Sequence, residues 1–492
     1  MSGAKILWVD DEIDLLKPHI LFLKGKGYDV ETCNNGYDAI DLVAARQFDL
    51  VILDEMMPGL TGLETLPRIK ELRPMTPVIM VTKSEEENIM DKAVGSKIAD
   101  YLIKPVNPNQ VLLSIKKNVH SQQLVTEQTT ADYRSEFGRI SSSFADARTF
   151  ADWVQIYRKL YNWEMELSES TDPGVREILS YQKNEANNEF AKFIKNRYLD
   201  WFAKPDDDTP VMSQNLIRKK VFPVVDAAPK TTFFLIDNFR YDQWRVIQPV
   251  LHSLFEVEKE DFYCSILPTA TQYARNAIFA GLMPDFLRRQ IQSQGKGYSL
   301  FFDKIVKTDS GKRLIENIDK VHNADFSVIV YNFLDILSHA RTETQIIRDL
   351  AEDEAAFRSL TRSWFEHSDL LELMRLLAER GHTIIITSDH GTIQVDNPVR
   401  VQGDRATSSN LRYKTGRNLG FNQKEVFAIT KPELAHLPKS NITSTYIFAY
   451  NRDFFVYPNN TNQFVRYYNN TFQHGGISME EMIVPFLVLK PR

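Results

Sequence analysis

The feature that most constrains this fold is a series of short apolar runs, each followed by a polar residue that can take part in chemistry. Within residues 1–120 the runs KILWV, YDVETC, LVILD, PVIMVT and DYLIK alternate with stretches whose apolar residues recur at helical spacing. Short apolar runs are typical of strands buried on both faces of a sheet, and strands that alternate with amphipathic helices build doubly wound α/β domains. We therefore predict a doubly wound parallel sheet for residues 1–120.

The pattern of apolar and polar residues changes twice after this first domain. Residues 121–205 are polar, with apolar side chains such as Trp153 and Tyr157 at helical spacing, which predicts a helical bundle or an extended helical linker. The run KPDDDTP at residues 204–210 places two prolines around three acids and marks a boundary. Residues 211–492 return to alternating apolar and amphipathic segments, so we predict a second α/β domain there.

The composition limits where this chain works and what it binds. Lys and Arg number 59 against 65 Asp and Glu, so the net charge of -6 offers no general attraction to nucleic acid or to an anionic membrane. Cys33 and Cys264 are too few for a disulfide framework or a thiolate zinc cage, so a bound metal must use histidine and carboxylate ligands. The N-terminal residues contain neither a secretory signal nor a membrane span, and we expect a cytoplasmic protein without a membrane anchor.

Polar side chains stand at the ends of four predicted strands in the first domain. These are Asp10 and Asp11 after KILWV, Asp54 in LVILD, Thr82 in PVIMVT and Lys104 in DYLIK. Carboxylates that converge on one pocket suit magnesium, while a hydroxyl and an ammonium can hold the oxygens of a transferred phosphoryl group. A single acid at a strand end is more often an ordinary solvated turn residue, but the whole set in register favours the functional interpretation.

The set resembles the receiver domains of two-component systems, which have a flavodoxin-like fold, over about the first quarter of the chain. The resemblance implies that Asp54 is the phosphoacceptor. It implies a magnesium site formed by Asp10, Asp11, Asp54 and the backbone carbonyl of Met56. The implied switch residues are Thr82 and Tyr101, and the implied phosphate contact is Lys104.

Residues 211–492 carry groups that can bind transition metals. The runs TTFFLID, SVIVYNFLD and TIIITSDHG are predicted buried strands that deliver Asp237, Asp335 and Asp389. His339 lies four residues after Asp335, the spacing of helical zinc ligands, and further imidazoles are His390 and, before two glycines, His474. Histidine with carboxylate favours zinc, or manganese, over calcium or magnesium. A lone histidine is more often a hydrogen-bonded core residue, but this many partners at strand ends favour a metal site.

The loop PTATQYARNAIFAGLMP, residues 268–284, leads into a helical pattern with a threonine near its start. A hydroxyl at a helix N-terminus lies beside exposed amide N–H groups, which favour an anion such as phosphate. Because a neutral threonine is a weak nucleophile, a metal ion must favour its alkoxide. The loop therefore indicates an anion site whose chemistry depends on metal.

The second domain resembles the alkaline phosphatase superfamily, in particular its nucleotide pyrophosphatase/phosphodiesterase branch. The loop matches that branch's Pro-Thr-x-Thr element ending in Gly-Leu-x-Pro, which implies Thr271 as the nucleophile. One implied zinc ion is held by Asp335, His339 and His474. The other is held by Asp237, Asp389, His390 and Thr271. A threonine in this loop is typical of the diesterases, so the resemblance implies a zinc-dependent phosphodiesterase that acts on nucleotides or short oligonucleotides.

The second domain also departs from that branch. The asparagine that usually helps to hold the phosphate has no clear counterpart, because DFLRRQ follows LMP. The candidates to replace it are Arg275, Asn276 and a basic loop with Arg405, Arg412, Lys414 and Arg417. A basic loop is more often simply solvated, so the phosphate contacts other than metal stay unassigned.

Together the three parts resemble response regulators with a PglZ-type effector domain, a group that includes a regulator of the type IX secretion system. The resemblance implies a sensor histidine kinase as phosphodonor and a sigma factor as partner. We hypothesise that phosphorylation of Asp54 promotes a homodimer and controls the hydrolase, with a role in secretion. The competing hypothesis is a non-enzymatic regulator whose phosphatase-like domain binds a sigma factor or a secretion component. Retention of all the metal residues and the nucleophile argues against it, because a docking module gains little from keeping them.

Overall fold

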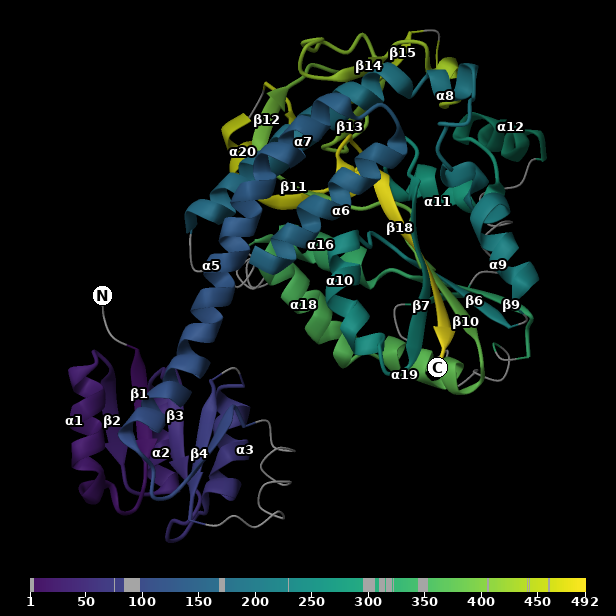
Figure 1. The fold of residues 1–492 in the computed structure, drawn as a ribbon. Helices are drawn as coiled ribbons and strands as arrows, with labels where there is room; N and C mark the ends of the chain where they lie inside the picture. The colour runs from purple at the N-terminus through teal and green to yellow at the C-terminus, as the bar shows by residue number, and fades with distance from the viewer. Residues whose placement is uncertain are drawn as a thin grey trace. The chain divides into compact units, whose positions relative to one another are not determined.

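The chain is described by a computed structural model and divides into two compact units, Met1–Asp132 and Tyr133–Arg492 (Figure 1). The structure describes residues 4–74, 76–83, 98–167, 173–228, 230–294, 306–308, 315, 321, 323–343, 353–404, 407–439, 441, 443–458 and 461–492.

A five-stranded sheet forms the centre of the first unit. Its strands are β1 (Lys5–Val9), β2 (Asp29–Cys33), β3 (Leu50–Asp54), β4 (Val78–Thr82) and β5 (Asp100–Ile103), in the order β2-β1-β3-β4-β5 with every pairing parallel. The helices around it are α1 (Lys17–Gly25), α2 (Gly36–Ala45), α3 (Gly62–Leu72) and the start of α5 (Pro108–Asp146). Successive residues of β1 point to opposite faces, so Ile6 and Trp8 pack with α1 and α5 while Leu7 and Val9 pack with α2 and α3. The predicted doubly wound parallel sheet is confirmed.

Helices occupy the middle of the chain, as the spacing of its apolar residues predicts. After α5, which is 39 residues long, come α6 (Phe150–Glu166), α7 (Pro173–Arg197) and α8 (Asp200–Ala203). A capping box starts α6, because the Thr149 side chain accepts a hydrogen bond from the backbone N–H of Asp152 and the Asp152 carboxylate accepts one from the backbone of Thr149. Trp153 and Tyr157 are buried in the same apolar core as the sheet of the second unit. The helices from Tyr133 onward are therefore part of that unit.

A six-stranded sheet runs through the second unit. Its strands are β6 (Thr231–Ile236), β7 (Phe255–Cys264), β8 (Val306–Thr308), β9 (Phe326–Tyr331), β10 (Thr383–Thr387) and β18 (Ile483–Pro491). They lie in the order β7-β18-β10-β6-β9-β8, with β10, β6, β9 and β8 paired in parallel and β18 antiparallel to both of its neighbours. The three strands predicted here, β6, β9 and β10, are adjacent and parallel. The alternation of the sequence did not predict β7 and β18, which make the sheet mixed.

Helices cover both faces of this sheet, which confirms a C-terminal α/β domain. Phe234 and Ile236 of β6 belong to the apolar cluster that includes α10 (Tyr241–Leu251), α18 (Glu354–Glu366) and α19 (Asp369–Glu379). Phe233 and Leu235 belong instead to the cluster that includes α9 (Phe222–Ala227) and α11 (Thr271–Ala280). Alternate side chains of one strand thus anchor helices on opposite faces, and the polar loops after the strands are left at the edge of the sheet.

Short strands and helices surround the carboxyl ends of β6, β9 and β10. β11 (Ile393–Val395) pairs with β17 (Thr471–Gln473), which brings the segment after His390 beside the segment before His474. The other elements are α12 (Pro284–Gln294), α16 (Phe333–Glu343), α20 (Thr461–Tyr468), α21 (Met479–Met482), and the strands β12 (Asn397–Arg400), β13 (Tyr413–Arg417), β14 (Phe427–Ile429), β15 (Ser444–Phe448) and β16 (Asp453–Val456).

One predicted strand is shorter than its apolar run. The run SVIVYNFLD was predicted to end in Asp335, but β9 ends at Tyr331 and α16 begins at Phe333. Asp335 therefore lies in the first turn of a helix, on the same face as His339 one turn later. The strand prediction was wrong at this end, because apolar residues continue from the strand into the buried side of the helix.

Candidate functional site

The predicted phosphorylation pocket is assembled at the carboxyl ends of the parallel strands in the first unit. Lys104, directly after β5, places its Nζ 2.8 Å from Asp10 Oδ2 and 3.1 Å from Asp54 Oδ1. Carboxylate oxygens of Asp10, Asp11 and Asp54 lie within 4.8 Å of one another, close enough to share one cation. Thr82, the last residue of β4, is fully buried. The structure thus brings together Asp10, Asp11, Asp54 and Lys104.

The pocket holds more negative charge than one lysine neutralises. Burial raises the pKa of Asp54 to about 6, the charge of Asp10 adds to the rise, and Lys104 opposes it. Asp54 Oδ2 is buried and accepts no hydrogen bond from any described residue. A divalent cation would relieve both conditions, so the residues fit magnesium. Met56, two residues after Asp54, is 58% exposed.

The predicted zinc ligands of the second unit fall into two groups. In the first, Asp237 follows β6, Asp389 and His390 follow β10, and their ligand atoms lie within 4.8 Å of one another. All three side chains are buried. Asp237 Oδ1 lies 3.8 Å from His390 Nε2 and accepts no hydrogen bond from any described residue. A buried carboxylate oxygen without a donor, facing an imidazole nitrogen, fits a bound transition metal.

The second group combines Asp335 and His339 of α16 with His474. His339 Nε2 lies 3.6 Å from Asp335 Oδ2, and His474 Nε2 lies 3.9 Å from Asp335 Oδ1. That Asp335 Oδ1 atom is buried and accepts no hydrogen bond from a described residue. The rings of His390 and His474 stack with their centroids 4.2 Å apart, so the two groups adjoin. Two adjoining groups of ligands are what a site with two metal ions requires.

Backbone carbonyls fix which nitrogen His390 and His474 present to the carboxylates. His390 Nδ1 lies 3.1 Å from Gly391 O, and His474 Nδ1 lies 3.1 Å from Thr269 O. Because a carbonyl only accepts, each Nδ1 must carry a proton, and Nε2 is the nitrogen that faces the carboxylates and could bind a metal. Burial also lowers the pKa of His474 well below its usual value, and His390 lowers it further, which keeps the ring in the neutral form that binds metals.

Thr271 is the first residue of α11 and lies beside the first group of ligands. Its Oγ1 is 3.0 Å from His390 Nε2. The residue before it, Ala270, provides no side-chain cap for the first turn, in which the N–H of Tyr273 donates to the carbonyl of Ala270 at 2.8 Å. Thr269 anchors the neighbouring loop, since its hydroxyl donates to Gly476 O at 2.9 Å and accepts from Gly475 N at 3.0 Å.

Two carboxylates of the first group titrate in opposite directions. Burial and the nearby Asp389 raise the pKa of Asp237 well above its usual value. Burial also acts to raise the pKa of Asp389, but Arg275 and His390 outweigh it and lower that pKa to about 2. The pKa values of two close buried carboxylates move apart in this way because ionisation of one carboxylate disfavours ionisation of the other.

The candidates for holding a phosphate have different surroundings. Arg275 is buried and ion-paired with Asp237 and Asp389. Arg412 is also buried and paired with Glu481, so it is not free for a ligand. The remaining candidates are Asn276, whose amide donates to Gln272 O, Lys414, whose ammonium donates to Ser408 O, and Arg417, which is exposed. Arg405 lies outside the described residues.

Sequence reasoning missed two residues of this site. Thr269, two positions before Thr271, holds the loop after His474. Asn332, between β9 and α16, accepts a hydrogen bond from Arg275. The Pro-Thr-x-Thr element contained a signal for Thr269, whereas nothing in the spacing of Asn332 distinguishes it from a turn residue.

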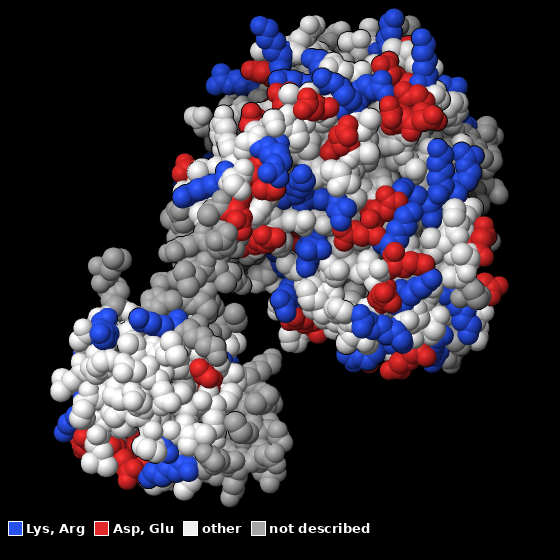
Figure 2. All heavy atoms as spheres, in the orientation of Figure 1, with Lys and Arg blue, Asp and Glu red and all other residues white. Residues whose placement is uncertain are grey.

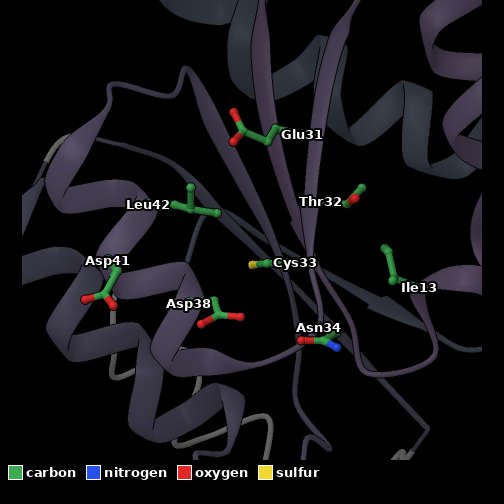
Figure 3. Close-up of a pocket in the computed structure, with 8 residues that line it drawn as sticks. All are labelled: Ile13, Glu31, Thr32, Cys33, Asn34, Asp38, Asp41 and Leu42. Atoms are coloured by element: carbon green, nitrogen blue, oxygen red, sulfur yellow. The ribbon is translucent and has the colours of Figure 1, made fainter.

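A separate hollow of about 640 Å³ lies between β2 and α2 in the first unit (Figure 3). Its polar lining includes Glu31, Asp38 and Asp41 together with Cys33. Burial, with the charge of Asp38, raises the pKa of the Cys33 thiol to about 12, so it is a poor nucleophile. Neither Lys104 nor Asp54 lines this hollow, so it is distinct from the phosphorylation pocket.

The visible face of the second unit carries charges of both signs. Figure 2 shows lysine and arginine interspersed with aspartate and glutamate over the visible face of that unit. This mixture agrees with the net charge of -6. Among the helices that the structure describes, none is both long and apolar enough to cross a membrane.

Three family models match successive parts of the chain. Residues 6–116 match the response regulator receiver domain, residues 123–202 match the PorX response regulator linker domain, and residues 216–489 match the BREX system PglZ alkaline phosphatase-like domain. The PglZ match alone covers more than half of the 492 residues.

Curated relatives match the receiver part. The transcriptional regulatory protein ZraR of Escherichia coli O157:H7 is 33% identical over 142 residues, which are 29% of this chain and 32% of that protein. The transcriptional regulatory protein ResD of Bacillus subtilis (strain 168) is 36% identical over 115 residues, which are 23% of this chain and 48% of that protein. The chain thus spans about a third to a half of the length of these relatives.

Among solved structures, a CheY-like receiver domain protein from Methanospirillum hungatei JF-1 covers 25% of this chain and 98% of its own, with 30% identity and a TM-score of 0.24. From the three family matches, the chain is a response regulator with a phosphatase-like effector, and it belongs to the PglZ alkaline phosphatase-like family.

Proposed function

We propose that this response regulator is phosphorylated on Asp54 and controls a dizinc phosphodiesterase that cleaves nucleotide or short oligonucleotide phosphodiesters through Thr271. The observation that carries the proposal is the position of Thr271 Oγ1, 3.0 Å from His390 Nε2 and at the start of a helix. A hydroxyl in that position has a helix N-terminus for a phosphate and a set of metal-binding side chains beside it.

The two groups of ligands fit zinc. Asp335, His339 and His474 would hold one ion, and Asp237, Asp389, His390 and Thr271 would hold the other. Bound zinc supplies a Lewis acid that favours the threonine alkoxide and offsets charge on the leaving oxygen. Magnesium would bind in the first unit at Asp10, Asp11, Asp54 and the Met56 carbonyl, where it offsets the repulsion between Asp54 and the incoming phosphoryl group.

The chain's own groups set the course of the reaction. Thr271 Oγ1 attacks phosphorus and a bond forms between them, while the bond from phosphorus to the leaving oxygen breaks. The threonine gives up its proton to solvent, and the leaving oxygen takes up a proton from solvent to become an alcohol. Water then cleaves the resulting phosphothreonine, which releases the phosphomonoester and restores the hydroxyl. The amide N–H groups at the start of α11 bind the non-bridging oxygens of the phosphate.

The threonine nucleophile supports diesters over monoesters as substrates.

In the signalling scheme we propose, a sensor histidine kinase in the cytoplasm supplies the phosphoryl group to Asp54, and the phosphorylated chain forms a homodimer. A sigma factor is the proposed output partner and secretion the proposed process. The domain bounds proposed for this scheme are 1–120, 121–205 and 211–492.

The decisive experiment compares the wild type with Thr271→Ala on bis(p-nitrophenyl) phosphate and on p-nitrophenyl phosphate, with zinc content measured in parallel. We expect the wild type to hydrolyse the diester faster and Thr271→Ala to retain zinc through its other ligands but lose turnover, by about a thousandfold or more. Wild-type rates in Thr271→Ala would refute the nucleophile. A wild type that binds zinc but hydrolyses neither ester would favour the non-enzymatic partner-binding module.

A further inference from the structure

We propose that Arg275 is a positioning residue that ties together the carboxyl ends of three strands and thereby sets the geometry of the metal ligands. The inference rests on the proposed function and deepens it, because it concerns the same site. Arg275 lies on α11, one helical turn after Thr271. Its side chain is 7% exposed, so its guanidinium is committed to the interior.

The contacts of Arg275 reach three neighbouring strands of the main sheet. Its Nη2 pairs with Asp237 Oδ2 at the end of β6, and its Nε donates to Asp389 Oδ2 after β10 at 2.9 Å. Its Nη1 donates to Asn332 Oδ1 after β9 at 3.2 Å. Because β10, β6 and β9 are adjacent in the sheet, one guanidinium connects the residues that follow three neighbouring strands.

Arg275 engages the side of Asp237 that faces away from the histidine. The pair with Arg275 uses Oδ2, whereas Oδ1 lies 3.8 Å from His390 Nε2 and accepts no hydrogen bond from a described residue. When a partner holds one oxygen of a carboxylate, the direction of the other oxygen is fixed as well. Groups that orient metal ligands act in this way. Arg275 thus directs Oδ1 toward the position that a metal ion would occupy.

The contact with Asn332 extends the same control to the second group of ligands. Asn332 directly precedes α16, and its carbonyl oxygen accepts a hydrogen bond from the N–H of Ile336 at 3.1 Å in the first turn of that helix. The helix carries Asp335 and His339. A shift of Asn332 would therefore move both residues relative to Asp237 and Asp389.

The shape of the guanidinium explains why a different cation would not serve. Three partners in three directions need the planar fork of arginine, whose N–H groups are fixed relative to one another. A lysine would keep the positive charge beside Asp237 and Asp389, but its three N–H donors radiate from one nitrogen and do not match partners that face three separate nitrogens of Arg275. Charge and geometry can therefore be separated by substitution.

The test measures zinc binding in the full chain for the wild type, Arg275→Lys and Arg275→Gln. The measurements are zinc content by elemental analysis and the zinc Kd by competition with a chromophoric chelator. Arg289→Gln is the matched control, since Arg289 is 68% exposed on α12 and its described contacts are with Asp285 and the ring of Phe286, both on the same helix. Circular dichroism establishes that each variant is folded.

We expect Arg275→Gln to weaken zinc binding by 10–100-fold, the typical cost of losing a group that orients a metal ligand, and Arg275→Lys to fall between it and the wild type. Arg289→Gln should match the wild type. If both Arg275 variants fold and hold zinc with the wild-type Kd, the positioning role is refuted. If they keep zinc but inorganic phosphate inhibits them more weakly, Arg275 is a phosphate contact instead, which also overturns the inference.

The same experiment separates failure of this inference from failure of the proposed function. A wild type without zinc refutes the dizinc proposal whatever the Arg275 variants do. If Arg275→Gln does not fold, Arg275→Lys decides the matter, because it retains the charge that the two buried carboxylates need. A folded Arg275→Lys with the wild-type zinc Kd would then refute the positioning role.

Discussion

The imidazoles of the candidate metal centre differ sharply in their surroundings. The His339 side chain is 61% exposed, whereas that of His390 is fully buried and lies 3.0 Å from Thr271 Oγ1. We predict that His339→Ala loses the zinc ion of its own group and keeps the other, with the fold intact, because few packing contacts are lost. His390→Ala should lose the zinc ion beside Thr271 and reduce turnover at least as much as Thr271→Ala.

Elemental analysis of both histidine variants, before and after equilibration with excess zinc, checks this prediction. Two zinc ions per chain retained in His339→Ala would show that this imidazole is no ligand. Turnover by His390→Ala at the wild-type rate would contradict the assignment of the ion beside Thr271.

At the scale of residues, the sequence predicted the groups that share a motif and missed those that share only a location. Asp389 and His390 were found because they directly follow an apolar run, and Thr271 because its loop matches a known element. Asn332 carried no such signal. The partners of Arg275 lie 38, 57 and 114 residues away from it, so a single sequence could not reveal them.

Among the elements, α6, α7 and α18 meet at a buried cluster of charges. Glu164 of α6 lies 2.7 Å from Lys183 Nζ of α7 and 2.8 Å from Arg358 Nη1 of α18. Burial acts to raise the pKa of Glu164, but Lys183 and Arg358 outweigh it and lower that pKa from 4.5 to about 2. The ionised carboxylate therefore stabilises the fold above pH 4.5, and this contribution is lost as the pH falls from about 4.5 to about 2.

We predict that Glu164→Gln removes this pH-dependent part of the stability. At pH 7 the variant should be less stable by about 3–4 kcal/mol, since one pKa unit corresponds to about 1.4 kcal/mol, and the difference from the wild type should vanish near pH 2. Calorimetry of the second unit's transition across this pH range is the measurement. Glu189→Gln, at an exposed pair on α7, is the control. A difference that stays constant with pH would exclude Glu164 as its source.

A second set of contacts joins α7 to α21, the short helix that follows His474, Gly475 and Gly476. The Asn187 amide donates to Glu480 at 3.0 Å, and its Oδ1 accepts from the backbone N–H of Met479 at 2.8 Å. Tyr161 also donates to Glu480, at 2.8 Å. The linker helices thus support α21, which lies between His474 and β18.

We predict that Asn187→Ala destabilises the second unit by about 1–3 kcal/mol, because it leaves the Met479 N–H without its acceptor and weakens the setting of Glu480. Asn188→Ala, at the exposed neighbouring position, should change stability by about 0.5 kcal/mol or less. Calorimetry of the full chain measures both. Equal stability of the two variants would mean that α7 packs on α21 without supporting it.

At the scale of elements, regular periodicity allowed prediction and short strands did not. The parallel strands of the first unit, and β6, β9 and β10 of the second, follow from apolar runs that alternate with helices. Strands of three residues such as β11 and β17 are too short for any pattern to appear, and their pairing depends on contacts between distant segments. The antiparallel β18 was missed because its run IVPFLVLKP contains prolines, which argue against a central strand.

At the scale of the whole molecule, phosphorylation of Asp54 in the first unit must change the behaviour of an effector that lies in the second unit. The residues available in the first unit are Thr82, Tyr101 and Lys104, which a phosphoryl group can recruit through its charge of roughly -1.5 to -2 and its acceptor oxygens. To move a population from 1:99 to 99:1 requires about 5.5 kcal/mol of differential binding. Association of two chains adds its own free energy to these local contacts.

We therefore predict that modification of Asp54 promotes a homodimer. Beryllofluoride with magnesium, which stands in for the phosphoryl group, should raise the sedimentation coefficient of the wild type and leave Asp54→Ala unchanged, because the variant lacks the carboxylate that bonds to beryllium. Thr82→Ala is the more informative variant. It keeps the acceptor but loses the hydroxyl that would follow the phosphoryl oxygens, so it should bind beryllofluoride and dimerise more weakly. If the mass of the wild type is unchanged when Asp54 is fully modified, dimerisation is excluded as the switch, and the signal must pass to a partner protein.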